Sequence, residues 1–280
     1  MLLSTFFFSL MNVCVKFLPH LPTMEVVLFR SVISLGLTYG SIRYAKVSPW
    51  GHNKPLLVSR GLTGAVALML YFSTIQHIPL AGAVMLQYLT PIFTALLGVF
   101  ITREKVDPWQ WLFFLLAFAG VLVIEGVDTR IPWYYALMGA GGAFLTGISY
   151  NSVRKLSATE HPLVIIFYFP LISLPLALVS CLFAWQTPQG LDWLWLGLTG
   201  ALTQLGQYFV TKSYQVAKVA QVAILNYVGI VYAVGLGLVI FGETFSGVAY
   251  GGMALVLLGV ILNMLYSRRV SLREAAQATA

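Results

Sequence analysis

Charged residues are scarce in this sequence. Of its 280 residues only 9% are Asp, Glu, Lys or Arg, while 59% are hydrophobic and the mean hydropathy is +0.86. A soluble domain usually carries about 25% charged residues, so the composition excludes an ordinary water-soluble enzyme, a disordered chain and a nucleic-acid-binding protein. Because a membrane helix takes roughly 20 apolar residues, the length suits about ten such helices with short connections.

Cysteines and buried carboxylates are equally scarce. Cys14 and Cys181 are the only cysteines, and both lie in apolar runs, so we expect buried thiols rather than a disulfide or a metal pair. No Asp or Glu falls in the middle of an apolar run, and no His, Asp and Glu cluster offers acid–base or metal chemistry. A Gly-x-x-x-x-Gly-Lys phosphate-binding sequence is also missing. The sequence therefore predicts no enzyme, no metal and no cofactor, and it argues against ATP-driven transport by this chain.

Ten apolar runs are predicted to form transmembrane helices, which makes the fold class all-α and polytopic. Each run is about twice as long as a barrel strand and lacks strict alternation. The seven tryptophans fall at or just outside the ends of the runs, where their rings prefer the headgroup layer. The tail after Ser267 is expected to be solvated and disordered. The predicted spans are 1–18, 24–42, 55–76, 81–101, 108–124, 132–153, 162–184, 192–213, 220–241 and 247–267.

The distribution of Lys and Arg predicts the orientation. With the N-terminus in the cytoplasm, twelve cations lie in the inner loops and the C-terminal tail, against Lys16 and Arg130 on the outer side. Such a bias favours cytoplasmic placement of both termini. We therefore expect an integral, multi-pass protein of the bacterial inner membrane, with 268–280 as a cytoplasmic tail.

An internal repeat is visible at an offset near 139 residues. Leu86-Gln87-Tyr88 matches Leu225-Asn226-Tyr227, Glu104 matches Glu243, and Gly120 matches Gly259. Each half would contain five helices, and an odd number places the second half upside down in the bilayer. Inverted repeats of this kind are typical of transporters that use alternating access around a site near the midplane. The predicted repeats are 1–126 and 131–267.

Several motifs resemble the drug/metabolite transporter superfamily. They are Arg60-Gly61-Leu62-Thr63-Gly64, Ile78-Pro79-Leu80-Ala81, the run from Leu86-Gln87-Tyr88 through Thr90-Pro91, and, in the second half, Leu225-Asn226-Tyr227 and Phe241-Gly242-Glu243. The resemblance is to two EamA-type domains in tandem. It implies ten helices in two inverted halves around a central cavity, and metabolite export or exchange. The sequence departs from the family pattern where Val228-Gly229-Ile230 replaces the second-half proline, and where Thr102-Arg103 precedes Glu104.

Polar side chains at membrane depth mark candidate substrate-binding residues, because they are costly in lipid and usually face a bundle interior or a water-filled cavity. Helical spacing places Gln87 and Thr94 on one face with Pro91, and Gln204 and Gln207 on another. Hydrogen bonding between helices, or a simple kink at Pro91, is the alternative interpretation. The candidates from these spans and their repeat equivalents are Gln87, Tyr88, Thr94, Gln204, Gln207, Asn226 and Tyr227.

Two arginines lie within spans and have no acidic residue within a helical turn. If Arg30 or Arg60 faces the cavity, it favours a substrate that carries carboxylate or phosphate. The alternative is that their side chains extend to the nearer membrane interface. Arg60 is the stronger candidate because Thr63 and Tyr71 continue its helical face towards the midplane. Arg30, Asn12 and His77 form a second group of candidates.

Glycines and helix-end carboxylates are expected to have structural roles. Gly139, Gly141, Gly142 and Gly147, together with Gly247 and Gly251, are predicted to allow close approach of helices. Glu104 and Glu243 follow the ends of predicted spans, and we expect them to act as helix caps or as determinants of topology.

These features predict a secondary transporter, an exporter or exchanger, of small polar metabolites such as amino acids or related anionic and zwitterionic compounds. A multidrug or nucleotide-like metabolite carrier is the alternative, and a channel or a membrane enzyme is a further one. The expected partners are a small-molecule substrate and the lipid bilayer, with no nucleic acid. A monomer is compatible with the sequence, which leaves the oligomeric state open.

Overall fold

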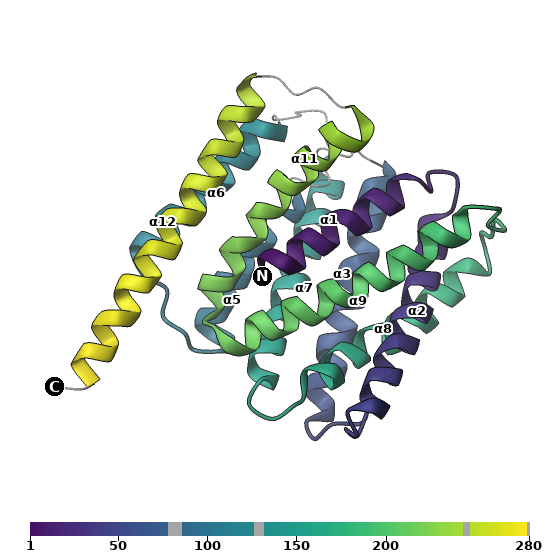
Figure 1. Cartoon of the computed structure of the whole chain (residues 1–280), viewed down its shortest axis with the longest axis horizontal. Helices are drawn as coiled ribbons and strands as arrows, with labels where there is room; N and C mark the ends of the chain where they lie inside the picture. Colours follow the sequence, from purple (N-terminus) through teal and green to yellow (C-terminus); the bar gives the residue numbers. More distant parts are fainter. Residues whose placement is uncertain (78–85, 126–131, 243–246, 279–280) are drawn as a thin grey trace.

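The computed structural model describes residues 1–77, 86–125, 132–242 and 247–278, without the side chains at 72, 75–77, 124–125, 234, 249 and 271–278. Every regular element in these ranges is a helix (Figure 1). The elements are α1 Leu2–Lys16, α2 Thr23–Tyr44, α3 Lys54–His77, α5 Thr90–Ile101, α6 Pro108–Glu125, α7 Trp133–Leu156, α8 Pro162–Cys181, α9 Asp192–Val216, α10 Val219–Ala223, the 3-10 helix η1 Ile224–Tyr227, α11 Val228–Phe241 and α12 Gly247–Ala278.

The helices follow the predicted apolar runs closely. Four segments are long and apolar enough to cross a membrane by length and composition: Thr23–Tyr44, Pro162–Cys181, Val219–Phe241 and Tyr250–Val270. Shorter apolar helices accompany them at Leu2–Lys16, Thr90–Ile101 and Pro108–Val123. The first part of the predicted span 81–101 lies outside the described residues.

The expectation of a disordered tail after Ser267 is wrong for the described part of the chain. Helix α12 continues without a break to Ala278. The physical reason is composition, because 267–278 contains good helix formers such as Leu, Arg, Glu and Ala, and no Gly or Pro that would end the helix.

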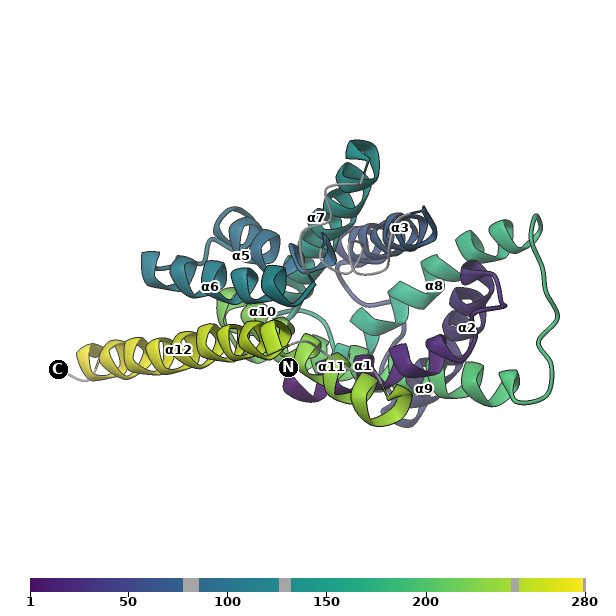
Figure 2. The ribbon, with the colours of Figure 1, turned by 90° about the horizontal axis from the view of Figure 1, so that it is seen from above.

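Helix packing pairs the two halves of the chain with each other. α6 lies along α12 at one edge of the molecule, and α2 lies against α8 at the other (Figures 1 and 2). Between them α3 packs on α7 while α1 packs on α9, and α5 contacts α7 while α11 contacts α1. The internal repeat would match α1 with α7, α2 with α8, α3 with α9, α5 with α11 and α6 with α12. Under this match the pairs α6–α12 and α2–α8 are each equivalent to themselves. The pair α3–α7 is equivalent to α9–α1, and α5–α7 is equivalent to α11–α1.

The contact between α6 and α12 has this exchange relation at the level of single atoms. A Cβ built on Gly120 would lie 2.6 Å from the carbonyl oxygen of Gly252 and 2.7 Å from the nitrogen of Val256. A Cβ built on Gly259 would lie 2.9 Å from the carbonyl oxygen of Phe113 and 2.9 Å from the nitrogen of Ala117. These six residues form three pairs at the 139-residue offset, 113 with 252, 117 with 256 and 120 with 259, so both helices use equivalent glycines to bring their backbones together.

The glycines named from the sequence divide into two groups. Gly139, Gly142 and Gly147 lie tightly against Leu86, Ala67 and Thr94, as expected for close approach. The prediction for Gly141 is wrong, because a Cβ there would meet only Leu70 at an ordinary 3.9 Å. Gly247 and Gly251 have open space around them, so the prediction for these two is wrong. They lie on a face of α12 that no described element covers, whereas the face that meets α6 carries Gly252 and Gly259.

Both Tyr-containing motifs interrupt their spans. The chain turns at Tyr88 and Leu89, and α5 then begins with Pro91 in its first turn, where the missing N–H costs little. In the second half the interruption is the 3-10 helix that ends at Tyr227. The rings of Tyr88 and Tyr227 stack with centroids 6.0 Å apart, so two residues related by the repeat contact each other.

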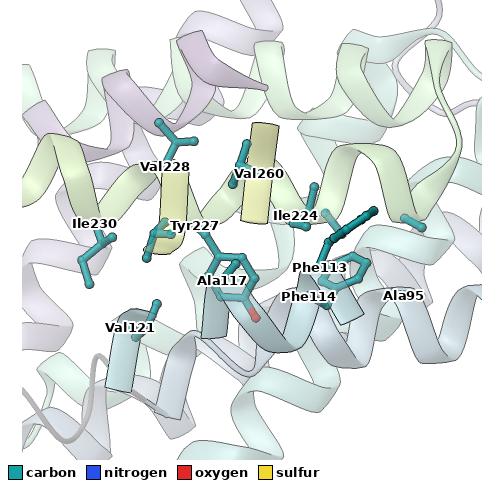
Figure 3. Close-up of a cluster of buried hydrophobic side chains, with 13 residues drawn as sticks. Ala95, Phe113, Phe114, Ala117, Val121, Ile224, Tyr227, Val228, Ile230 and Val260 are labelled. Atoms are coloured by element: carbon teal, nitrogen blue, oxygen red, sulfur yellow. The ribbon is translucent and has the colours of Figure 1, made fainter. Parts of the chain in front are cut away.

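A buried apolar cluster surrounds this interruption. Figure 3 shows Tyr227 among side chains of α6 and α12, including Phe114, Ala117 and Val260. Tyr227, Phe114 and Ala117 are fully buried. The cluster therefore fixes the broken span against the α6–α12 pair.

Replacing either glycine of the α6–α12 contact should destabilise the protein. Gly120→Ala and Gly259→Ala insert a methyl group against backbone that cannot move aside, and such overpacking costs about 1–3 kcal/mol. Gly251→Ala is the matched control on α12, because it enters open space and improves helix propensity by about 1 kcal/mol. Thermal unfolding in detergent micelles would measure the effect, and equal midpoints for all three variants would contradict this account of the contact.

Candidate functional site

Arg60 is buried in the interior of the helix bundle. It is only 2% exposed, so its guanidinium does not extend to the headgroup layer. Its Nη2 donates a hydrogen bond to Oε1 of Gln207 at 3.1 Å, which joins α3 to α9. Nε and Nη1 have no hydrogen-bond partner among the described residues. Two donors of a planar, charged fork are therefore available.

Arg30 and Arg60 face the same aromatic ring. The guanidinium carbon of Arg60 lies 4.9 Å from the ring centroid of Phe169, and that of Arg30 lies 5.6 Å from it. Arg30 is 7% exposed, and its Nη2 also lacks a partner among the described residues. Cation–π contacts contribute roughly 0.5–2 kcal/mol each, which offsets only part of the cost of burying a charge. We call Arg30, Arg60, Phe169 and Gln207 the basic cluster.

Aromatic residues connect the basic cluster to a second polar region. Tyr150 lies within electrostatic range of Arg60, and its ring stacks on Tyr214 with centroids 4.9 Å apart. The Tyr214 hydroxyl is buried near Thr94 and Asn226, but it forms no hydrogen bond of good geometry with a described residue.

The second region contains several buried polar atoms that lack partners within the described part of the chain. Gln87 contributes Oε1, Thr90 contributes Oγ1, and Asn226 contributes Nδ2. The hydroxyl groups of Tyr214 and Tyr227 are unpaired in the same way. Unpaired buried polar groups are rare in folded proteins, and each needs an explanation such as a ligand or ordered water. We call Gln87, Thr90, Tyr214, Asn226 and Tyr227 the neutral polar cluster.

Thr94 and Tyr88 lie at the edge of this region. The Thr94 hydroxyl donates to the carbonyl of Thr90 at 2.7 Å, and its own carbonyl accepts from Nδ2 of Asn151 at 2.9 Å. Tyr88 stacks on Tyr227 as described above. Thr94 therefore contributes mainly to packing between α5 and α7, while Tyr88 and Tyr227 form an aromatic wall.

Other candidates from the sequence lie apart from these clusters. The side-chain oxygen Oε1 of Gln204 accepts hydrogen bonds from the hydroxyl of Ser34 at 2.7 Å and from that of Thr38 at 2.9 Å. This is the hydrogen bonding between helices that was the alternative interpretation of this residue. The Thr63 hydroxyl bonds to the carbonyl of Ser59 in its own helix. Asn12 is exposed and Tyr71 is half-buried, and the side chain of His77 lies outside the described residues.

Glu104 connects several helix ends on one side of the bundle. Its Oε1 accepts from Nε of Arg154 at 2.8 Å, and its Oε2 accepts from the backbone N–H of Val219 at 2.6 Å. Nη1 of Arg154 donates to the carbonyl oxygens of Tyr214 and Gln215. The expected capping role is thus observed, at the start of α10. Glu243 lies outside the described residues.

Sequence reasoning did not single out Phe169, Tyr150, Tyr214 or Asn151. Aromatic residues in an apolar run look like ordinary core residues, and periodicity alone does not show which ring faces an arginine. One signal was available, because Phe169 is the repeat equivalent of Arg30. If the two halves are related by a two-fold axis, a residue that contacts its own equivalent lies near that axis.

The fold and its interior define a class of protein. Long apolar helices enclose buried charged and polar groups, which is the arrangement of a multi-pass membrane protein with a polar interior rather than a lipid-facing polar surface. The EamA-like transporter family matches residues 1–126 and 133–265. The chain belongs to this family, and it is an integral membrane transporter of small metabolites.

Named relatives are transporters as well. The pseudopaline exporter of Pseudomonas aeruginosa is 30% identical over 262 residues, which cover 92% of each chain. Solute carrier family 35 member G1 of Mus musculus is 31% identical over 250 residues, covering 82% of this chain and 68% of the relative. A riboflavin transporter of Vibrio cholerae is 28% identical over 203 residues, covering 70% and 66%.

The fold itself is known. A crystal structure superposes with a TM-score of 0.85 and covers 96% of both chains at 20% sequence identity. At this identity the likeness establishes the helix arrangement alone.

Substitutions in the neutral polar cluster should separate function from stability. Gln87→Ala and Asn226→Ala each remove a buried polar atom that has no described partner, so we expect an unchanged or higher thermal midpoint and reduced transport. Gln204→Ala is the contrasting variant, because it breaks two hydrogen bonds and should lower stability by roughly 0.6–2 kcal/mol. Transport per folded molecule in proteoliposomes is the measurement. Loss of stability with normal specific activity in the first two variants would assign them to interhelical bonding.

Proposed function

We propose that this protein is a secondary transporter, an exporter or exchanger, of small anionic or zwitterionic metabolites. The observation that carries the proposal is the pair of buried arginines that both lie against the ring of Phe169, with three nitrogen atoms that lack partners among the described residues. A substrate carboxylate would accept hydrogen bonds from the planar fork of Arg60 in the bidentate geometry that guanidinium groups favour. The pseudopaline exporter and the riboflavin transporter among the relatives support a small metabolite as the substrate.

The neutral polar cluster would bind the rest of the substrate. Amide and hydroxyl groups of Gln87, Asn226 and Tyr214 offer both donors and acceptors without a charge. An amino group or hydroxyl group of a zwitterionic metabolite would be accommodated there. The Tyr150–Tyr214 stack links the basic cluster to the neutral polar cluster, and we propose that one elongated substrate contacts both.

The proposed mechanism is alternating access by two inverted five-helix repeats, 1–126 and 131–267. Three observations support it: the exchange relation among packed helices, the equivalent glycine contacts of α6 and α12, and the contacts of Tyr88 with Tyr227 and Arg30 with Phe169. Residues contact their own equivalents only near a two-fold axis. A site on such an axis is accessible in turn from either side when the halves exchange conformations.

A carrier of nucleotide-like or drug-like aromatic compounds is the second candidate. The stacked Tyr88 and Tyr227 favour it, because an aromatic wall binds flat rings. The two candidates differ in their dependence on Arg60. An aromatic substrate without a carboxylate would not need its charge.

Substitution of Arg60 tests the sign of the substrate. Arg60→Gln should weaken an anionic or zwitterionic substrate by about 10- to 100-fold, because a hydrogen bond to a charged group contributes about 1.5–3 kcal/mol. Arg60→Lys retains the charge and loses the planar fork, so its affinity for the substrate should lie between those of the wild type and Arg60→Gln. The measurement is counterflow in proteoliposomes with a panel of amino acids, dicarboxylates, neutral aromatics and cations.

Arg268→Gln is the control, because Arg268 is exposed on α12. Removal of an unpaired buried charge should not lower the thermal midpoint. Counterflow of a neutral or cationic substrate that is unaffected by Arg60→Gln would overturn the anionic assignment and favour the second candidate.

The proposed location is the bacterial inner membrane with both termini in the cytoplasm. The support is the distribution of cations, of which twelve lie on one side in this orientation. Reporter fusions after Lys46, Arg103 and Arg154 should be cytoplasmic, whereas fusions after Pro79, Asp128 and Pro188 should be external. An external signal after Lys46 or Arg154 would contradict the orientation and the inverted arrangement together.

A further inference from the structure

A groove lies on the outer surface of the bundle between α2 and α9. Its volume is about 630 Å³, and its lining includes Gly36, Gly40, Leu163, Gln204 and Tyr208. A Cβ built on Gly36 or Gly40 would meet nothing within 4 Å. The groove thus exists because two glycines on one face of α2 leave the space that larger side chains would fill.

The groove has the length and the surroundings of one bilayer leaflet. It extends along α2 from Gly36 to Ala45, which is about 13 Å at the helical rise per residue. Half of the hydrocarbon core is about 15 Å thick. Leu37 and Leu205 on its walls are 45% and 42% exposed, so this surface faces hydrocarbon in the membrane. Water would find almost no partners there, and lipid is the medium that fills such a space.

The polar end of the groove is closed towards the interior. The side-chain oxygen Oε1 of Gln204 already accepts hydrogen bonds from Ser34 and Thr38. Gln207, through which α9 contacts the basic cluster, does not line the groove, and neither does any other residue of that cluster. The groove is therefore separate from the proposed substrate site, and the inference does not depend on the identity of the substrate.

Basic residues adjoin the end of the groove that Tyr44, Ala45 and Tyr208 line. Arg43 and Lys46 are exposed at the end of α2, and Lys212 is exposed one turn beyond Tyr208 on α9. None of the three forms an ion pair with a described carboxylate. Nearby Glu160 is buried and accepts hydrogen bonds from the backbone of His52 and Asn53. Tyr44, 92% exposed, adds the aromatic ring typical of a membrane interface.

We propose that the groove between α2 and α9 binds an anionic phospholipid, with one acyl chain along Gly36 and Gly40 and the phosphate against Arg43, Lys46 and Lys212. The acyl chain exchanges one hydrocarbon environment for another, so selectivity comes from the headgroup. A basic residue near an anionic surface contributes about 1 kcal/mol, which is about fivefold in affinity. Three of them predict a preference for an anionic over a zwitterionic headgroup on the order of 100-fold.

Native mass spectrometry of protein released from mixed phosphatidylglycerol and phosphatidylcholine nanodiscs tests the proposal. The wild-type protein should retain one phosphatidylglycerol. Gly36→Leu and Gly40→Leu fill the groove and should lose this lipid, although every basic residue remains. Gly251→Leu is the matched control, because it also enters open space, and it should retain the lipid. Thermal midpoints close to that of the wild type would show that the variants fold.

The headgroup contacts are tested by neutralisation. Arg43→Gln, Lys46→Gln and Lys212→Gln combined should reduce the preference for phosphatidylglycerol to near parity. The control combines Lys105→Gln, Arg268→Gln and Arg269→Gln, which removes the same charge from other exposed positions and should leave the preference unchanged. Equal loss in both triple variants, or retention of the lipid by Gly40→Leu, would overturn the proposal. Displacement of phosphatidylglycerol by glycerol phosphate alone would also overturn it, because the site would then be one for a soluble anion.

Discussion

Hydrocarbon offers no hydrogen bonds, and this constraint determines how the polar residues of the chain are arranged. Serine and threonine in the helices mostly satisfy it locally. Thr38 donates to the carbonyl of Ser34 at 2.6 Å, and Thr199 donates to that of Trp195 at 2.8 Å, each one turn back in its own helix. Against this background the unpaired nitrogens of Arg60 and Arg30 are exceptional. Unlike the unpaired amide and hydroxyl groups of the neutral polar cluster, they carry a charge, so their burial costs more, and for this reason they dominate the functional interpretation.

Much of the helix arrangement was predictable because it depends on apolar length and on repeat spacing. The runs 24–42 and 162–184 became α2 and α8 with small shifts at their ends, and the match of Gly120 with Gly259 anticipated the close backbone contact between α6 and α12. Helical periodicity also placed Gln204 and Gln207 on neighbouring positions of one face. It did not show that Gln204 contacts α2 while Gln207 contacts Arg60, because that depends on the rotation of α9 against two different neighbours.

The packing scaffold and the polar sites differ in how well they follow the repeat. The glycines of α6 and α12 and the tyrosines of the interrupted spans have equivalent partners in both halves. Arg30, by contrast, corresponds to Phe169, so one half supplies a cation and the other supplies the ring against which it lies. Under the proposed mechanism, equivalent packing would allow both halves to adopt the same pair of conformations, whereas the arginines, which the other half lacks, supply the positive charge of the interior.

The ion pair of Arg154 with Glu104 and the buried guanidinium of Arg60 have different energetic roles. Arg154 and Glu104 are partly exposed, at 25% and 16% of their side chains, so water can replace their ion pair at small cost when helix ends separate. The guanidinium of Arg60 has no such replacement while it is buried. If a substrate carboxylate binds there, the closed conformation is less costly when loaded than when empty, because the ligand supplies the missing acceptors. A transporter with this property converts between its two access conformations more readily when substrate is bound than when the site is empty. This favours exchange of substrates over return of the empty transporter.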